Sequence, residues 1–384
     1  MEIGWVEITP GRQAGWEPVE SLFAQPVGDG WHAQFASLVR IRPMSELSKR
    51  KWGFNLGALL EEAVDRQRQF IESRHFSREL NAEDEPPERR TIALRAIRRP
   101  GCPSIHLALL AKVWAPSMEA ARQAASEHFD DIHASFPTDY ELIPARTPEV
   151  FRSLAGWDLL QTAAHPKAIA EIQRYEWVLR AANTPLYLLG AWKFNNTSNE
   201  QIWRALYNTD RAVLFNVTLR PTLLDEREQN ALLVIARFAE QLAEQPTPPQ
   251  VKYYAEFAAK NYANLLQQLR RPYLVQTHVL APDGLPEYLP RLIGSAVTHR
   301  AAGEAATPGF DVIYPLDPLQ ASKWCANLAW LETDVGTTPV IDARFVRVRK
   351  MSDAHEARGL FALPFPPESG LPDVTFAETL ENLV

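Results

Sequence analysis

The stretch VLFNVTLRPT, residues 213–222, predicts a β-strand that ends at a proline, and residues 225–243 after it predict a helix. A proline favours the end of a strand because it has no N–H to donate to a neighbouring strand. Asp225 and Glu228 have the spacing of a capping box, which favours a helix that begins at this point. The unit therefore predicts a strand, a turn, and a helix that returns onto the sheet.

Two other parts of the sequence repeat this order of strand, proline turn and helix. They comprise strand 105–114, Pro116 and helix 118–134, and then strand 273–280, Pro282 and helix 285–297. Each of the helices has one apolar face, which is typical of a helix that packs on a sheet. The predicted fold class is α+β, a two-layer structure with ferredoxin-like split βαβ units repeated along the chain.

The remaining elements complete two predicted domains and a tail. Apolar residues at helical spacing predict further helices at 56–76, 166–182, 251–269 and 319–331, and a strand is predicted at 340–348. We assign residues 1–150 to an N-terminal α+β domain and 151–358 to a second α+β domain that holds two of the strand–proline–helix units. Residues 359–384 form a predicted extended tail that is rich in proline.

Composition excludes several classes of protein. The 384 residues carry 40 Lys and Arg against 47 Asp and Glu, a net charge of −7, which argues against a protein that coats nucleic acid over its whole surface. No apolar run approaches the roughly 20 residues of a membrane span, and the N-terminus lacks the pattern of a signal peptide. Two cysteines without a paired pattern complete the prediction of a reduced, cytoplasmic protein.

Sequence motifs of catalysis are missing. The chain has 17 glycines against 30 prolines and contains no P-loop, GxGxxG or GxSxG motif. His128 and His133 flank two aspartates but are five residues apart, so we interpret this segment as a solvated helix face rather than a metal site. We predict no enzyme, no cofactor and no metal-binding residue. A hydrolase whose site is assembled from scattered residues is left open.

Basic residues gather in two places along the chain. The candidate nucleic-acid contacts are Arg98, Arg99, Arg344, Arg347, Arg349 and Lys350. Arginine suits contacts with phosphate because its guanidinium group is a planar fork of donors. The alternative interpretation is a sheet surface on which these cations form salt bridges with the more numerous carboxylates.

The tail combines large apolar residues with several prolines. Phe361, Leu363, Phe365 and Leu371 are the candidate residues for docking to a partner. A proline-rich segment loses little conformational entropy when it becomes ordered, because proline already restricts the unfolded chain. We therefore predict that the tail docks in extended form on its own or a neighbouring subunit.

Three segments resemble a known class of protein. The segments are residues 215–222 with their acidic-capped helix, residues 269–276 with 281–286, and the tail GLFALPF with Gly370-Leu371-Pro372. They are similar to the non-catalytic N-terminal region of HerA/FtsK-type ATP-binding proteins. In that family, a segment similar to this tail leads into a P-loop motor, whereas this sequence ends at Val384 without one. The resemblance therefore implies that the motor, a HerA/FtsK-type ATPase, is supplied by another chain.

The implied function is a non-enzymatic assembly or adaptor subunit of a nucleic-acid-handling or defence complex. Its partners would be another protein chain, a second copy of itself, and nucleic acid that it binds weakly alone. The alternative is a protein-binding scaffold with no role in nucleic-acid metabolism. The arginine-bearing strands favour the first reading and the acidic net charge favours the second.

Overall fold

A computed structural model describes the chain in twelve stretches. They are residues 23–27, 30–43, 56–75, 90–163, 165–181, 184–190, 192, 199–269, 271–298, 309–334, 345–365 and 374–380.

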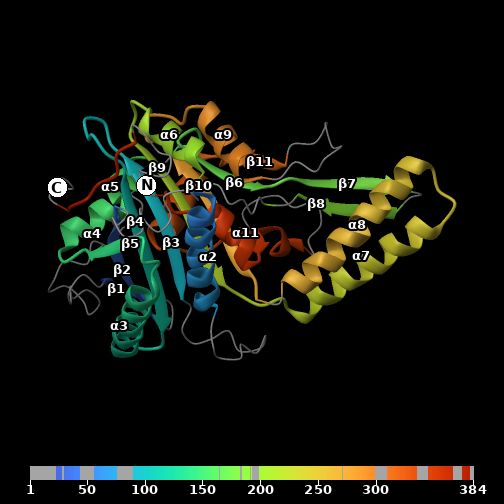
Figure 1. Ribbon diagram of the computed structural model, residues 1–384, viewed down its shortest axis with the longest axis horizontal. Coiled ribbons are helices and arrows are strands. Elements are labelled where there is room, and N and C mark those ends of the chain that lie inside the picture. Colours follow the sequence, from blue (N-terminus) through green and yellow to red (C-terminus); the bar gives the residue numbers. More distant parts are fainter. Residues whose placement is uncertain are drawn as a thin grey trace.

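One large antiparallel sheet forms the body of the molecule (Figure 1). Its strands run in the order β1 (Phe23–Val27), β2 (Gly30–Ile41), β4 (His106–Ala115), β3 (Thr91–Arg98), β9 (Val213–Pro221), β10 (Tyr273–Leu280), β6 (Ile169–Arg174) and β11 (Phe310–Ile313). Two short strands add to it: β5 (Tyr140–Pro144) pairs with β2, and β12 (Met351–Ser352) pairs with β10. β3 pairs with β9 along Ile92–Arg98, so the predicted boundary at residue 150 does not separate two sheets.

Helices cover both faces of this sheet. On one face the core includes residues of α2 (Leu56–Arg74), α3 (Met118–Ser135), α6 (Glu200–Tyr207), α9 (Tyr288–Val297) and α11 (Ala354–Leu360). The opposite face, which we call the α10 face, is covered by α4 (Pro148–Ala155), α5 (Trp157–Thr162) and α10 (Pro318–Ala329). The mixed α+β class is confirmed. The predicted two-layer arrangement is wrong, because Leu110 and Leu280 make the second face apolar as well.

Two of the three predicted units return onto the sheet as expected. Pro116 follows the last residue of β4, and Ser117 caps α3 by accepting a hydrogen bond from the backbone N–H of Ala120. Pro282 lies just past the end of β10, and α9 packs near β6 and β11. The ferredoxin-like repetition of these units stays a prediction.

The third unit departs from the prediction after its strand. Pro221 is the last residue of β9, and the predicted capping box of Asp225 and Glu228 is confirmed at the start of α7 (Glu226–Glu244). However, α7 packs on α8 (Pro249–Gln268) rather than on the large sheet. The reason is that the apolar face of α7 finds a matching apolar face on α8, which includes Ala258 and Tyr262.

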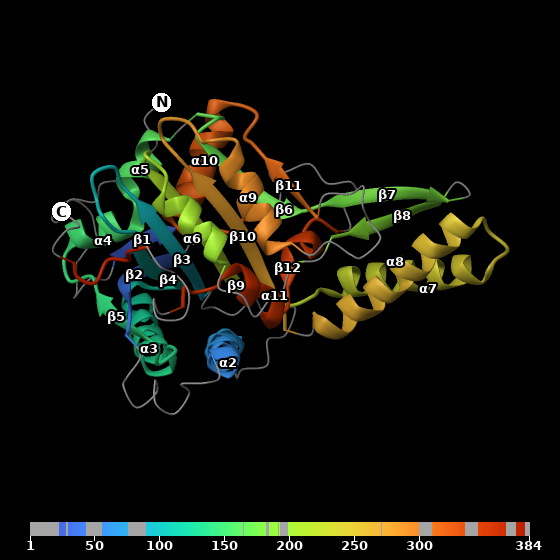
Figure 2. The same cartoon turned by 45° about the horizontal axis from the view of Figure 1, so that its top comes forward.

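The α7–α8 hairpin and a β-ribbon form an arm that projects from the body (Figures 1 and 2). The ribbon consists of β7 (Glu176–Ala181) and β8 (Thr184–Leu189). The Asn261 side-chain amide donates a hydrogen bond of 3.1 Å to the carbonyl oxygen of Leu189, which joins α8 to β8. At the base of the arm, Leu274 of β10 belongs to the same apolar cluster as α7 and α8.

Two predicted elements are corrected. Residues 166–182 are not a helix, because they supply β6 and β7 instead. β6 is buried on both sides, and a strand of this kind lacks the polar–apolar alternation that distinguishes strand from helix. The predicted strand 340–348 lies outside the described residues up to 344, and its described end runs into the 3₁₀ helix η2 (Val348–Lys350). The helices predicted at 56–76, 251–269 and 319–331 are confirmed as α2, α8 and α10.

None of the helices in the described stretches is both long and apolar enough to span a membrane.

Candidate functional site

Arg98 and Arg99, the predicted nucleic-acid contacts at the end of β3, form hydrogen bonds and an ion pair within the chain. The guanidinium group of Arg98 donates to the carbonyl oxygen of Tyr207 at 3.2 Å and lies over the Tyr207 ring. Arg99 forms an ion pair of 2.9 Å with Asp158 and donates a hydrogen bond to the carbonyl oxygen of Ser153. Both arginines therefore tie the end of β3 to neighbouring helices, as in the salt-bridged alternative.

In the second basic group, Arg349 and Lys350 are buried and form ion pairs. Arg349 and Lys350 are each 3% exposed, and they form ion pairs with Glu176 at 3.5 Å and with Glu171 at 2.8 Å. η2 packs near β6 and β10 and holds both side chains against carboxylates, so neither is exposed in this structure. Their contact with nucleic acid stays a prediction. Arg344 lies outside the described residues.

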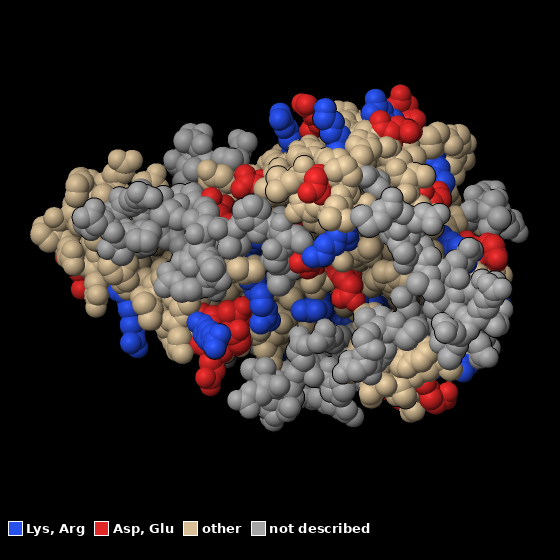
Figure 3. All heavy atoms as spheres, turned by 180° about the vertical axis from the view of Figure 1, so that it is seen from behind, with Lys and Arg blue, Asp and Glu red and all other residues tan. Residues whose placement is uncertain are grey.

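Arg347 is the more exposed member of this group. Its Nη1 lies 3.8 Å from the Asp225 carboxylate and 3.6 Å from the Glu228 carboxylate. Its Nη2 donates a hydrogen bond of 2.6 Å to the Thr222 hydroxyl. These contacts fix the beginning of α7 and hence the base of the arm. On the face shown in Figure 3, most Lys and Arg side chains lie beside Asp or Glu side chains.

A buried polar row crosses four central strands of the α10 face. Glu171 of β6, His278 of β10, Asn216 of β9 and Arg95 of β3 are direct neighbours in the strand register. Arg95 donates to the Asn216 side-chain oxygen at 2.9 Å and to the carbonyl oxygen of Leu328 at 2.7 Å, and it also reaches the carbonyl oxygen of Ala155. The last two carbonyls lie near the ends of α10 and α4, so the row attaches these helices to the sheet.

Burial sets the protonation of this row. Loss of solvation lowers the pKa of Arg95 to about 9 and the pKa of His278 to about 4. Burial alone would raise the pKa of Glu171, but the charge of Lys350 outweighs it and holds that pKa below the usual range. Glu171 is thus an ionised partner of Lys350, and His278 is neutral at pH 7. The row has the charges of a structural network, in which each ion is already paired or hydrogen-bonded.

The histidines of α3 differ from the sequence-based interpretation. His128 is buried and packs edge-on against the Phe35 ring, and loss of solvation holds its pKa well below 6.5. The predicted solvated face is therefore wrong for His128, because this side of α3 packs on β2. Across the described stretches, no three His, Cys, Asp or Glu side chains are grouped to hold a metal ion.

The described part of the tail docks on its own chain. Phe361, Leu363 and Phe365 are all buried, and Phe365 packs against Ala63 and Val64 of α2. Of the two predicted docking modes, the intramolecular one is present, so these three residues are not free to dock on a partner. Leu371 lies outside the described residues.

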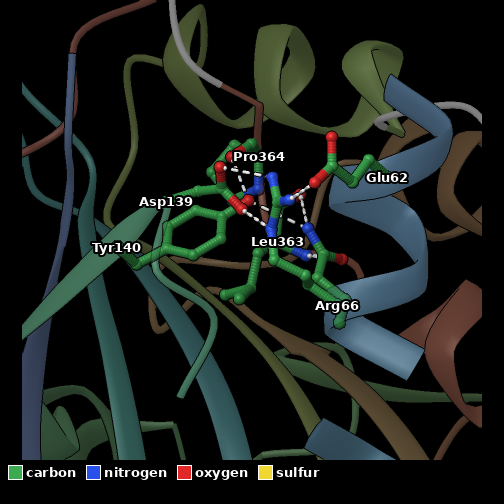
Figure 4. Close-up of polar contacts among 7 residues, drawn as sticks. Glu62, Arg66, Asp139, Tyr140, Leu363 and Pro364 are labelled. Carbon is green, nitrogen blue, oxygen red and sulfur yellow. Dashed lines mark hydrogen bonds and ion pairs between the residues drawn. The ribbon is translucent and has the colours of Figure 1, made fainter. Parts of the chain in front are cut away.

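A set of hydrogen bonds, which we call the clamp, holds this segment on Gln67 and Tyr140 (Figure 4). The backbone N–H of Leu363 donates to the Gln67 side-chain oxygen at 3.2 Å, and the Gln67 amide donates back to the carbonyl oxygen of Leu363 at 3.4 Å. The Tyr140 hydroxyl accepts from the Gln67 amide at 2.9 Å and donates to the carbonyl oxygen of Pro364 at 3.0 Å. The Gln67 side chain therefore pairs with both the N–H and the C=O of Leu363, as a neighbouring strand would.

Ion pairs of Arg66 position α2, the helix that carries Gln67. Arg66 makes two hydrogen bonds of 2.8 Å to the carboxylate of Asp139 and a further ion pair of 2.8 Å with Glu62 (Figure 4). Such two-point contacts fix orientation as well as distance. They hold α2 against the start of β5, where Tyr140 lies.

The clamp yields a testable expectation. Gln67→Leu should destabilise the tail by about 1–3 kcal/mol, because it leaves the buried N–H and C=O of Leu363 without their partners. Amide hydrogen exchange at residues 361–365 should become faster in this variant. Gln69→Leu, at an exposed position of the same helix, serves as the control. Equal exchange in both variants would show that the clamp does not hold the tail.

The arm carries large apolar side chains on its surface. Leu233 and Val234 on α7 are 41% and 60% exposed, and Tyr253 on α8 is 49% exposed. They lie outside the apolar cluster in which Leu232 and Ile235 join the two helices. The arm is therefore stabilised from within and still presents an apolar surface to other molecules.

Sequence reasoning missed both the polar row and the arm. Arg95, Asn216 and His278 could have been noticed as polar residues in the middle of otherwise apolar strands. The arm left no such signal, because an apolar helix face looks the same whether it packs on a sheet or on another helix.

Neither a protein-family model nor a curated protein matches this chain in sequence.

Proposed function

We propose that this protein is a non-enzymatic assembly subunit that binds another protein chain through its arm. The proposal rests on the α7–α8 hairpin, which projects from the body and exposes the side chains of Leu233, Val234 and Tyr253. Leu233 and Val234 are adjacent in the sequence and both exposed, and neighbouring exposed apolar side chains are found at sites that bind other proteins. Arg347 supports this role, because its contacts with Asp225 and Glu228 hold the base of the arm in place.

The sequence resemblance suggests the kind of partner. We infer that the partner is a HerA/FtsK-type ATPase within a nucleic-acid-handling or defence complex of the cytoplasm. Nucleic acid would then be contacted chiefly by the partner, because the described arginines of the candidate interface are already paired within this chain. Direct contact by this chain would be weak and would depend on the assembled complex.

A protein-binding scaffold with no nucleic-acid role is the second candidate. The internal pairing of Arg99, Arg349 and Lys350 favours it, as does the net charge of −7. The two candidates differ in one measurable property. A nucleic-acid-handling complex binds DNA or RNA at low salt when the partner is present, and its affinity falls steeply as salt is added.

The arm can be tested by co-expression with a HerA/FtsK-type ATPase encoded beside this chain. The double variant Leu233→Glu and Val234→Glu should weaken the complex at least about tenfold, because it places two charges in the centre of the contact. Both side chains are exposed, so the variant should fold normally. Leu316→Glu is the matched control, since Leu316 is 84% exposed and lies on the body.

Unchanged affinity of the double variant would contradict the role of the arm. Failure of the intact pair to associate would contradict the choice of partner while leaving the arm itself to be tested with the chain's own second copy. Sedimentation of the chain alone measures whether two copies associate. If they associate through the arm, the same double variant should abolish that association.

A further inference from the structure

Three polar side chains lie side by side on the α10 face, away from the central polar row. Gln34 of β2 and Thr91 of β3 are both direct partners of Lys112 on β4, which lies between them. Directly opposed residues in neighbouring strands point to the same side of a sheet, with side chains about 5 Å apart. All three are almost completely buried. We call Gln34, Lys112 and Thr91 the β4 triad.

Two members of the β4 triad have polar atoms that the protein does not satisfy. The amide oxygen and nitrogen of Gln34 and the hydroxyl of Thr91 are buried without a hydrogen-bond partner. Buried polar groups are nearly always hydrogen-bonded in folded proteins, since an unpaired one is costly. Three such atoms, on the two residues that are paired with the buried Lys112, indicate a place built to bind something polar.

The contacts of the Lys112 ammonium group indicate the charge of the group that the β4 triad binds. It donates a hydrogen bond of 2.6 Å to a carboxylate oxygen of Glu332, and the His32 ring nitrogen lies 3.4 Å from the same oxygen. Although burial would raise the pKa of Glu332, the Lys112 charge outweighs it, with His32 and Arg220 adding to the effect. This position therefore favours a negatively charged oxygen.

Glu332 reaches this position from a strained and partly exposed segment. Leu331, the residue before it, has a backbone φ of +50°, a left-handed conformation that a leucine rarely adopts. The Glu332 side chain itself is 37% exposed, unlike the triad beneath it. A carboxylate on such a segment can leave Lys112 without disrupting the sheet.

We propose that the β4 triad is a binding site for a phosphate group, with the Glu332 carboxylate occupying the position of one ligand oxygen. The ligand oxygens would accept hydrogen bonds from the Lys112 ammonium, the Thr91 hydroxyl and the Gln34 amide N–H. A protonated phosphate oxygen would in turn donate to the amide oxygen of Gln34. Glu332 and the ligand compete for Lys112, so phosphate binding displaces the Glu332 carboxylate. This proposal concerns the body of the protein and is independent of the arm.

The full chain should be tested by thermal unfolding in inorganic phosphate and in chloride at the same ionic strength and pH. At a phosphate concentration about tenfold above its Kd, the unfolding midpoint should rise by about 2 °C for a chain of this size. Lys112→Met should abolish the rise. A wild-type midpoint that is equal in the two salts up to molar phosphate would overturn the proposal.

Two conservative variants separate binding from folding. Gln34→Met and Thr91→Val keep the side-chain volume but remove the unpaired atoms, so each should unfold at the same or a higher temperature in chloride. Each should weaken phosphate binding about tenfold or more, because it removes a hydrogen bond to a charged group. Thr277→Val is the matched control, since the Thr277 hydroxyl is also buried and unpaired but lies on the opposite face of the sheet.

Glu332→Gln is expected to strengthen phosphate binding, whereas the variants of the β4 triad weaken it. Removal of the competing charge should strengthen phosphate binding about tenfold, and phosphate should restore the stability that this variant loses in chloride. A similar rise of the midpoint in the wild type and every variant would show a general salt effect and overturn the proposal. Weaker binding in Glu332→Gln would also contradict it, because Glu332 would then assist the ligand rather than compete with it.

Discussion

Acidification from pH 7 to pH 4 is expected to lower the free energy of unfolding by several kcal/mol. Loss of solvation, aided by Arg99 and Arg98, lowers the pKa of His106 to about 4, and loss of solvation also lowers the pKa of His278 to about 4. In the unfolded chain both side chains return to a pKa of about 6.5. Each histidine therefore contributes about 3 kcal/mol to this loss.

The direction follows from which state takes up the protons. Between pH 6.5 and pH 4 the unfolded chain binds protons at these two histidines while the folded chain does not, so falling pH favours unfolding. The stability is present above pH 6.5 and is lost as the pH falls towards 4. Glu171 adds a further loss at lower pH, because Lys350 outweighs burial and holds the pKa of its carboxyl below the usual range.

Chemical denaturation at a series of pH values measures this loss. His278→Gln and His106→Gln should each remove about 3 kcal/mol of this loss, whereas His355→Gln, at an exposed position of α11, should leave it unchanged. A free energy of unfolding that stays constant from pH 6.5 to 4.5 would contradict the buried, neutral state of both histidines.

Lys350→Met is the second variant with a large expected effect, a loss of about 3–5 kcal/mol of stability. Lys350 and Glu171 are 2.8 Å apart and both are buried, so removing the ammonium group leaves a carboxylate uncompensated in the interior. The Lys350 ammonium also donates to the carbonyl oxygen of Asp334, which joins η2 to the segment after α10. Urea denaturation gives the change directly.

A second substitution distinguishes the lost ion pair from a simple packing defect. Glu171→Gln in the Lys350→Met background should recover much of the stability, because it removes the unpaired charge. Lys323→Met is the control for an exposed pair: Lys323 is 57% exposed and contacts Asp334, so its loss should cost less than about 1 kcal/mol. If Lys350→Met instead left stability unchanged but reduced nucleic-acid binding, the predicted contact of Lys350 with phosphate would be supported.

Much of the local structure followed from the sequence. The capping box at Asp225 and Glu228 and the prolines at the strand ends act on residues a few positions away, so short patterns predicted them correctly. The same holds for α2, α3, α8 and α10, whose apolar residues recur at helical spacing. The mixed α+β class was predictable for this reason as well.

Only the tertiary structure decided which surfaces these elements meet. The apolar face of α7 packs on α8 instead of the sheet, and β6 lies buried in the sheet although its residues also fit a helix. Arg349 and Lys350 looked like surface cations, yet Glu176 and Glu171 lie more than 170 positions away in the sequence. Local patterns determine where a helix begins and which face is apolar. Burial, charge pairing and the β4 triad depend on strands that are far apart in the sequence and become neighbours only when the chain folds.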